Sequence, residues 1–255
     1  DRLRSRGLGD VYKRQLNYCR YHKKLSDKTI RAYKIDLSQY GVFSNELSKQ
    51  ALWDYIEYLN KKYKPKTAKR KLATLKAFIH FLLLQDLIDF NPFDKLETTI
   101  KEPLLLPKTI PLGVIAKLIS FSYQQIVFAK SDYQIRSAVR NTAILELLFA
   151  TGARVAEICT LRSDNVDLLG NSVKFYGKGS KERIIPIENF AVLSILRKYH
   201  SLFEKEIPDS GYFFVNKLGR RMTEQSVRNM INFYCKQCGV DMHITPVSYT
   251  HLRAH

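Results

Sequence analysis

The chain has 255 residues, of which 45% are hydrophobic, so it is long enough for one large globular domain or two smaller ones. Its 42 lysines and arginines against 24 acidic residues give a net charge of +18 at pH 7, which predicts a polyanionic partner, nucleic acid ahead of an anionic membrane. No apolar run approaches the length of a membrane span and no signal peptide is recognisable, so the composition argues against a membrane location.

The four cysteines show no spacing typical of a disulfide framework, which fits a reducing cytoplasm. Cys235 and Cys238 form a single CxxC inside a helical pattern, with no second pair in the chain. A zinc or redox site is one interpretation, and two cysteines packed in a core is the other. We expect no metal and no cofactor.

Both ends of the chain differ in character from its interior. Residues 1–15, DRLRSRGLGDVYKRQ, have no clear apolar periodicity, and residues 247–255, VSYTHLRAH, break off in the middle of a pattern. Both resemble translated sequencing-library adapter, so we predict that neither is native and exclude both from fold reasoning. The remaining chain is still strongly basic.

Residues 16–96 are predicted to form a helical bundle. Ser26 and Ser48 are good N-caps for the second and third helices. In the fourth, apolar residues recur every three or four positions, the pattern of an amphipathic helix: Ala68, Leu72, Leu75, Ile79 and Leu82. The expected helices cover residues 16–24, residues 27–41, a stretch after Ser48, and a stretch from Pro65 or Thr67 to before Asn91.

The fourth helix begins with a basic cluster. Lys66, Lys69 and Arg70 fall opposite the apolar seam, and no acidic residue is interleaved with them. A helix N-terminus also favours phosphate. We therefore expect these three side chains to contact DNA, and the alternative is an ordinary solvated face.

Residues 97–110 contain Pro103 and Pro107 and have no helical period, so they are predicted to link two domains. The second domain, residues 111–246, is expected to mix helices with a small sheet, which makes the whole chain mainly α with an α+β second domain. Its expected helices cover residues 111–123, 136–151, 153–161, 188–203 and 224–238, with strands at 172–176 and 183–187 and a buried extended segment at 212–215.

The stretch from Thr142 to Ile187 carries the residues with the most specific chemistry. A helix stops at Gly152, and a short second helix carries Arg154 and Glu157 three residues apart. Because Arg154 neighbours apolar residues, we expect it to be only partly exposed and to need an anionic partner. Glu157 either forms a structural ion pair with it or orients its planar fork toward two phosphate oxygens.

A glycine-flanked lysine follows on the turn of the predicted hairpin. Lys178 lies between Gly177 and Gly179, where the backbone can approach a ligand closely. Such a lysine can give a proton to a leaving oxygen if a nearby cation lowers its pKa. An ordinary solvated lysine is the alternative, and Lys181 is a rival in the same turn.

Together these segments resemble the tyrosine recombinases of the phage integrase family, of the Xer-like kind. ATGARVAEICTLRSDNVD followed by FYGKGSKERIIPI is similar to the signature of the family's catalytic domain. LSDKTIRAYKIDL, KTAKRKLATLKAFIHFL and NPF are similar to its N-terminal core-binding (SAM-like) domain. The resemblance extends from about residue 16 to residue 246.

The resemblance implies that a helical domain, residues 16–96, and a catalytic domain, residues 111–246, close around double-stranded DNA. A tyrosine hydroxyl then attacks a backbone phosphate, which leaves a 3′-phosphotyrosyl link and a free 5′-hydroxyl, with no metal or cofactor. A homotetramer on two paired duplexes is expected of the full-length protein. A non-catalytic DNA-binding relative and a type IB topoisomerase are the alternative functions.

The family's roles carry over onto matching positions of this sequence. Arg154 matches the first catalytic arginine, Glu157 its supporting acid, and Lys178 the general acid. Residues that match basic positions facing DNA in the family are Lys181, Arg183, Arg221 and Arg228.

The sequence departs from the family after Pro246. There the family continues with a His-x-Leu-Arg-His motif and later a nucleophilic tyrosine, whereas this chain continues with VSYTHLRAH. His251 and Arg253 are separated by one residue instead of two, and Tyr249 comes about two helices too early. We therefore predict a C-terminally truncated chain that has no nucleophile and binds DNA without cleaving it.

Overall fold

The structure is a computed structural model that describes residues 8–102, 110–177 and 182–240. The chain divides into two compact units, residues 1–105 and 106–255, and each is described by itself. Among the described residues, no helix is long and apolar enough to cross a membrane.

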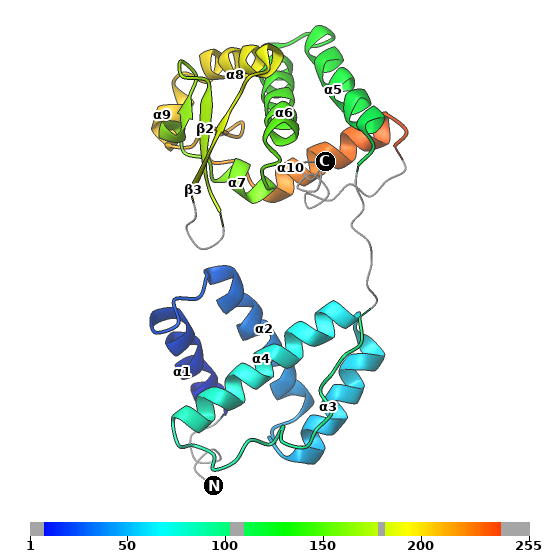
Figure 1. The fold of residues 1–255 in the computed structure, drawn as a ribbon, viewed down its shortest axis with the longest axis vertical. Coiled ribbons are helices and arrows are strands. Elements are labelled where there is room, and N and C mark those ends of the chain that lie inside the picture. Colours follow the sequence, from blue (N-terminus) through cyan, green and yellow to red (C-terminus); the bar gives the residue numbers. More distant parts are fainter. Residues whose placement is uncertain (1–7, 103–109, 178–181, 241–255) are drawn as a thin grey trace. The chain divides into compact units, whose positions relative to one another are not determined.

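The first unit is a bundle of four helices in which α4 contacts each of the other three (Figure 1). Ser26 and Ser48 cap α2 and α3 as predicted, because each side chain accepts a hydrogen bond from a backbone N–H in the first turn. The predicted seam of α4 is buried along its whole length. The helices are α1 (Leu8–Tyr21), α2 (Asp27–Phe43), α3 (Lys49–Lys62) and α4 (Pro65–Leu84).

The first helix begins eight residues before its predicted start at residue 16. Val11 and Gln15, one helical turn apart, are both buried. The prediction was wrong because residues 1–15 were taken to be non-native, whereas residues 8–15 belong to a helix that packs in the bundle. Gln15, whose amide occupies a core-facing position, interrupts the apolar pattern that would have indicated this helix. The amide nitrogen and oxygen of Gln15 and the hydroxyl of Tyr12 are buried, and each lacks a hydrogen-bond partner in the described part of the chain.

A charged network lies between α2 and α4. Asp36 is buried and accepts hydrogen bonds from Lys71 at 3.0 Å and from the hydroxyl of Thr74 at 3.1 Å. Arg70 also donates to this carboxylate. Residues 97–102 form no helix or strand after the bundle, and residues 103–109 of the predicted linker lie outside the described residues.

The second unit is organised around α6, which lies between α5 and α8 (Figure 1). Most of its side chains from Ala138 to Leu148 are buried, and α10 packs against α5 and α7. The helices are α5 (Leu112–Val127), α6 (Asp132–Thr151), α7 (Val155–Cys159), α8 (Phe190–Leu202), α9 (Glu206–Ser210) and α10 (Glu224–Gln237).

Helix α6 starts four residues before its predicted start, because Ser131 caps it and the side-chain oxygen of Gln134 accepts the N–H of Ser131, which completes a capping box. Pro111 is the N-cap of α5 and not part of its first turn. Helix α9 was not predicted; it is a single short segment that ends at Gly211, whose φ of 68° favours glycine. Thr223 caps α10, because its hydroxyl accepts the N–H of Ser226 at 3.1 Å.

A three-stranded antiparallel sheet completes this unit. The strands are β1 (Val166–Asp167), β2 (Ser172–Tyr176) and β3 (Glu182–Pro186), in the order β1-β2-β3. The two-residue β1 was not predicted, because a pair of residues carries no alternating pattern. In β2 and β3, Val173 opposes Ile185 and Phe175 opposes Arg183. Val173, Phe175 and Ile185 are buried, so this face of the hairpin is the one turned to the core.

The segment after α9 is buried, as predicted, but it bends between isolated bridges at Tyr212 and Val215. Phe213, Phe214 and Val215 are all core residues. The hydroxyl of Tyr199 in α8 donates to the carbonyl of Phe213 at 2.9 Å and accepts from the N–H of Val215 at 3.0 Å. Cys235 and Cys238 lie in the core of the same unit.

Candidate active site

The junction between α6 and α7 fixes the position of Arg154. Gly152 adopts a left-handed conformation with φ 61°, and its N–H bonds to the carbonyl of Leu148 at 3.0 Å. The chain therefore ends α6 and turns within two residues, and Arg154 becomes the N-cap of α7. Both ends of the turn are held, because Ala153 is fully buried and its N–H bonds to the hydroxyl of Thr151 at 3.2 Å.

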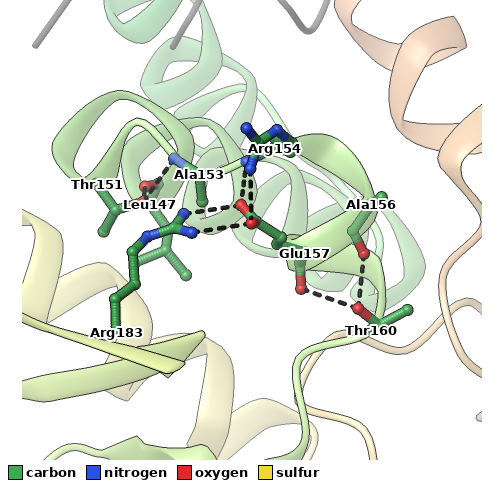
Figure 2. Close-up of polar contacts among 8 residues, drawn as sticks. All are labelled: Leu147, Thr151, Ala153, Arg154, Ala156, Glu157, Thr160 and Arg183. Atoms are coloured by element: carbon green, nitrogen blue, oxygen red, sulfur yellow. Dashed lines mark hydrogen bonds and ion pairs between the residues drawn. The ribbon is translucent and has the colours of Figure 1, made fainter. Parts of the chain in front are cut away.

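Glu157 is the centre of the hydrogen-bond cluster that surrounds Arg154 (Figure 2). Its carboxylate accepts the N–H of Arg154 at 2.7 Å and Nη1 of Arg154 at 3.2 Å. The first contact is the N3-to-N-cap half of a capping box, and the second is an ion pair. One acidic residue therefore fixes both the backbone and the side chain of Arg154.

Arg183, from β3, is the second cation on this carboxylate (Figure 2). Its Nη1 and Nη2 atoms lie 2.9 and 2.8 Å from the two oxygens of Glu157, which is a bidentate pair. Arg183 reaches α7 because it occupies an inward position of the hairpin, opposite Phe175 and two residues before buried Ile185. The two terminal nitrogens of Arg183 thus face Glu157.

The electrostatics of the cluster favour a charged Glu157. Burial by itself would raise the pKa of this carboxyl, but hydrogen bonds from Arg183 and from the backbone of Arg154 lower the pKa below its ordinary value. The same pair raises the pKa of Arg183. The site is therefore a carboxylate between two guanidinium groups, with one positive charge in excess.

Arg154 is more exposed than its apolar neighbours had led us to predict. Its side chain is 60% exposed, whereas that of Glu157 is 6% exposed. The expectation of partial burial was wrong because Arg154 caps α7 and does not share the buried face of Ile158. An exposed guanidinium held by a buried carboxylate can bind an anion from solution.

Lys178 and Lys181, the two candidate lysines of the hairpin turn, lie outside the described residues. So do Tyr249, His251 and Arg253. The strands that flank the turn are described, and they place Arg183 beside α7.

The basic cluster of α4 has acidic partners that its local sequence does not reveal. Glu102 lies 3.8 Å from Lys66 and 3.0 Å from Lys69, and Asp36 accepts from Arg70. The side chain of Lys66 is 87% exposed and those of the other two are about half exposed. The two pairs with Glu102 are partly exposed and weak, so Lys66 and Lys69 can exchange them for phosphates, whereas Arg70 is held by buried Asp36.

The two remaining predicted DNA contacts belong to the region of α10. Arg228 pairs with Glu224 one turn earlier, at 2.8 Å. The guanidinium of Arg221 lies 5.6 Å from the ring centre of Tyr212, and within the described ranges it forms no ion pair. Arg162 lies 4.9 Å from the same ring. The sequence analysis did not name Arg162 as a candidate DNA contact. Its position beside Tyr212 depends on the pairing of two segments that are 50 residues apart, which no local sequence pattern indicates.

Comparisons with known proteins agree on one family. Residues 118–254 match the description "Phage integrase family", and residues 13–86 match "Phage integrase, N-terminal SAM-like domain". The first match continues past Pro246 and includes most of the segment that the sequence predicted to be foreign. A tyrosine recombinase of Agathobacter rectalis is 46% identical over 92% of this chain and 79% of its own length.

Solved structures share the fold. A XerH site-specific recombinase bound to palindromic difH substrate, in a post-cleavage complex, has a TM-score of 0.72 at 15% identity, over 94% of this chain and 71% of that one. A lambda integrase tetramer bound to a Holliday junction has a TM-score of 0.69 at 14% identity, over 97% of this chain and 70% of that one. The family matches and the relative at 46% identity establish that this chain belongs to the phage integrase family of tyrosine recombinases.

Proposed function

We propose that the protein is a site-specific recombinase that cuts and rejoins duplex DNA through a 3′-phosphotyrosyl intermediate. The observation that carries the proposal is the exposed guanidinium of Arg154, fixed at a helix N-terminus by buried Glu157, in a chain of this family. A rigid, exposed fork of this kind suits two oxygens of one phosphate.

The proposed chemistry follows from these residues. Attack on a phosphodiester builds negative charge on the non-bridging oxygens, and Arg154 is placed to stabilise it without further reorganisation. Lys178 protonates the 5′-oxygen as it leaves, and Lys181 contacts the backbone. The nucleophilic tyrosine is supplied by sequence that the 255 residues do not contain, so this chain binds DNA without cleaving it.

The partner is double-stranded DNA, bound in the cytoplasm and without a metal or cofactor. Lys66, Lys69, Arg70, Arg221 and Arg228 contact its backbone. The full-length protein acts as a homotetramer on two paired sites, by analogy with the lambda integrase tetramer bound to a Holliday junction. The proposed domains are a DNA-binding bundle that includes helix α1 from Leu8, a linker at residues 97–110 and a partial catalytic domain that begins at residue 111.

A covalent trap tests the proposal. The parent gene is sequenced past codon 246, and the protein with its natural C-terminus is incubated with nicked suicide duplex. We expect a denaturant-resistant complex in which the protein is linked to a 3′-phosphate, and none from the 255-residue chain. A parent gene that continues without a His-x-Leu-Arg-His motif and a later tyrosine would favour a non-catalytic DNA-binding relative.

Two further measurements separate the alternatives. A type IB topoisomerase relaxes supercoiled plasmids of any sequence, whereas a site-specific recombinase does so only on plasmids that carry its site. A basic scaffold without a DNA function would bind duplex weakly and with little salt dependence. Contacts with several phosphates predict instead a steep, linear fall of log K with log salt concentration.

A further inference from the structure

We propose that Arg183 is a positioning residue for Arg154, and that it acts by saturating the carboxylate of Glu157. The inference rests on the proposed function, since it assigns a role to Arg183 in the same reaction. It replaces the expectation that Arg183 touches the DNA backbone directly.

The division of hydrogen bonds in the cluster carries this inference. Arg183 binds both oxygens of Glu157, at 2.9 and 2.8 Å, while the side chain of Arg154 makes one contact of 3.2 Å with a single oxygen. A guanidinium has five N–H donors. Because Arg183 forms the two shorter hydrogen bonds to the carboxylate, the side chain of Arg154 keeps most of its N–H donors available for a phosphate.

The charge balance gives the same result. Two guanidinium groups and one carboxylate leave a net charge of +1 beside the exposed edge of Arg154. Without Arg183, the buried carboxylate has only Arg154 to neutralise it, and a buried carboxylate strongly favours a bidentate partner. Glu157 would then draw the fork of Arg154 onto itself, and the site would lose both its excess charge and its free donors.

The position of Arg183 explains why it acts indirectly. It stands on the core-facing side of the hairpin, with its guanidinium 5.2 Å from the ring centre of Phe175, and its side chain is 33% exposed. Both terminal nitrogens are already engaged. This pair uses one N–H on each terminal nitrogen and holds the guanidinium against α7, whereas the more exposed guanidinium of Arg154 can bind a phosphate from where it is.

The test is a double-mutant set in the protein with its natural C-terminus. Arg183→Met keeps the aliphatic stem over Phe175 and removes the charge. We expect its single-turnover cleavage rate on suicide duplex to fall by about 10²-fold, the scale of a misplaced catalytic group. The dissociation constant for uncleaved duplex should change much less, because the phosphate contacts outside the site remain.

The second variant decides between positioning and direct contact. Adding Glu157→Gln to Arg183→Met should restore a large part of the lost cleavage rate. A neutral glutamine still accepts the N–H of Arg154 but does not hold its guanidinium. Arg183→Lys, which keeps the charge and loses the bidentate geometry, should fall between Arg183→Met and the wild type.

Lys174→Met is the matched control. Lys174 lies on the neighbouring strand, is also 33% exposed and pairs with Glu182 at 2.6 Å. The substitution therefore removes one positive charge from the same hairpin, as Arg183→Met does. We expect cleavage at the wild-type rate. Melting temperatures of all variants are measured first, and rates are compared where every variant is folded.

Three results would overturn the inference. They are an unchanged cleavage rate in Arg183→Met, the absence of rescue by Glu157→Gln, and a loss of duplex affinity whose salt slope falls by about one, which indicates a direct phosphate contact. Arg154→Ala is run alongside. If it cleaves normally, the proposed function has failed; if it is inactive and Arg183→Met is unaffected, only the role of Arg183 is wrong.

Discussion

Two buried glutamates in consecutive helices show how hydrogen-bond partners decide the direction in which the pKa of a buried carboxyl shifts. Glu146 in α6 and Glu157 in α7 are both 7% exposed. Among the described residues, Glu146 accepts one hydrogen bond, from the hydroxyl of Tyr123 at 3.0 Å, and burial raises the pKa of Glu146. Glu157 is held by Arg154 and Arg183, and these contacts lower its pKa. Burial alone therefore does not mark a site; the number and charge of the partners do.

Gln15 in α1 extends the comparison to a buried side chain without partners. It is fully buried, and neither its amide nitrogen nor its amide oxygen is hydrogen-bonded among the described residues. The three side chains form a series, from two arginines through one hydroxyl to none. Each step predicts a different response when the side chain is replaced.

The largest effect is expected for Glu157→Ala. It removes the shared partner of two arginines, and we expect the free energy of unfolding to fall by about 2–3 kcal/mol, less than for a fully buried pair because both arginines can regain water. Thermal unfolding checks this. Glu182→Ala, which breaks an exposed pair with Lys174, should cost much less. Equal losses in the two variants would contradict the account.

Gln15→Leu should have the next largest effect, in the opposite direction. Replacing an unpaired buried amide with a side chain of similar size removes a desolvation penalty, so we expect a gain of about 1–2 kcal/mol. The free energy of unfolding in urea is measured for Gln15→Leu and for a control, Asn17→Leu. Asn17→Leu, at an exposed position of the same helix, should lie within about 0.5 kcal/mol of the wild type. A loss of stability in Gln15→Leu would show that its amide has a partner in solution.

Glu146→Gln is expected to stabilise the protein at pH 7 by about 1 kcal/mol, the scale of one hydrogen bond. The neutral amide still accepts from Tyr123 and no longer has to be buried as a charge. The melting temperature at pH 7 measures the gain. A lower melting temperature would mean that the charged carboxylate is the better partner at this position.

The smallest expected effects are opposite pH slopes. The raised pKa of Glu146 gives stability that is present below the unfolded carboxyl value of about 4.3 and is lost as the pH rises through the folded value. The lowered pKa of Glu157 gives stability that is present above that value and is lost as the pH falls through the folded value. Unfolding from pH 3 to pH 8 should show that Glu146→Gln flattens the upper part of the profile and Glu157→Gln the acid part.

Much of the helical framework could be predicted from local sequence. Ser26, Ser48 and Thr223 are caps whose hydrogen bonds lie within one turn, and the seam of α4 repeats every three or four residues. The start of α1 was missed because residues 1–15 had been predicted to be non-native, and because buried Gln15 places an amide where an apolar pattern requires an apolar side chain. Helix α9 and strand β1 are too short to show a period.

The site was predictable where its geometry is local. Glu157 lies one helical turn from Arg154, and sequence spacing alone pairs them. Arg183 is 26 residues away from Glu157, and its role depends on the hairpin. One signal was available: Arg183, Ile185 and Ile187 alternate, which places the arginine on the core-facing side of the strand. The acids that pair with Lys69 and Arg70 come from Glu102 and Asp36, which only the tertiary fold brings to α4.

The most direct test of the central claim is the covalent trap with Arg154→Ala, in the protein with its natural C-terminus. The measured quantity is the fraction of suicide duplex in the denaturant-resistant complex after a single turnover. We predict no detectable complex for Arg154→Ala and a wild-type fraction for Arg197→Ala, an exposed arginine of α8. Normal trapping by Arg154→Ala would contradict the assignment of Arg154 as the arginine that binds the reacting phosphate.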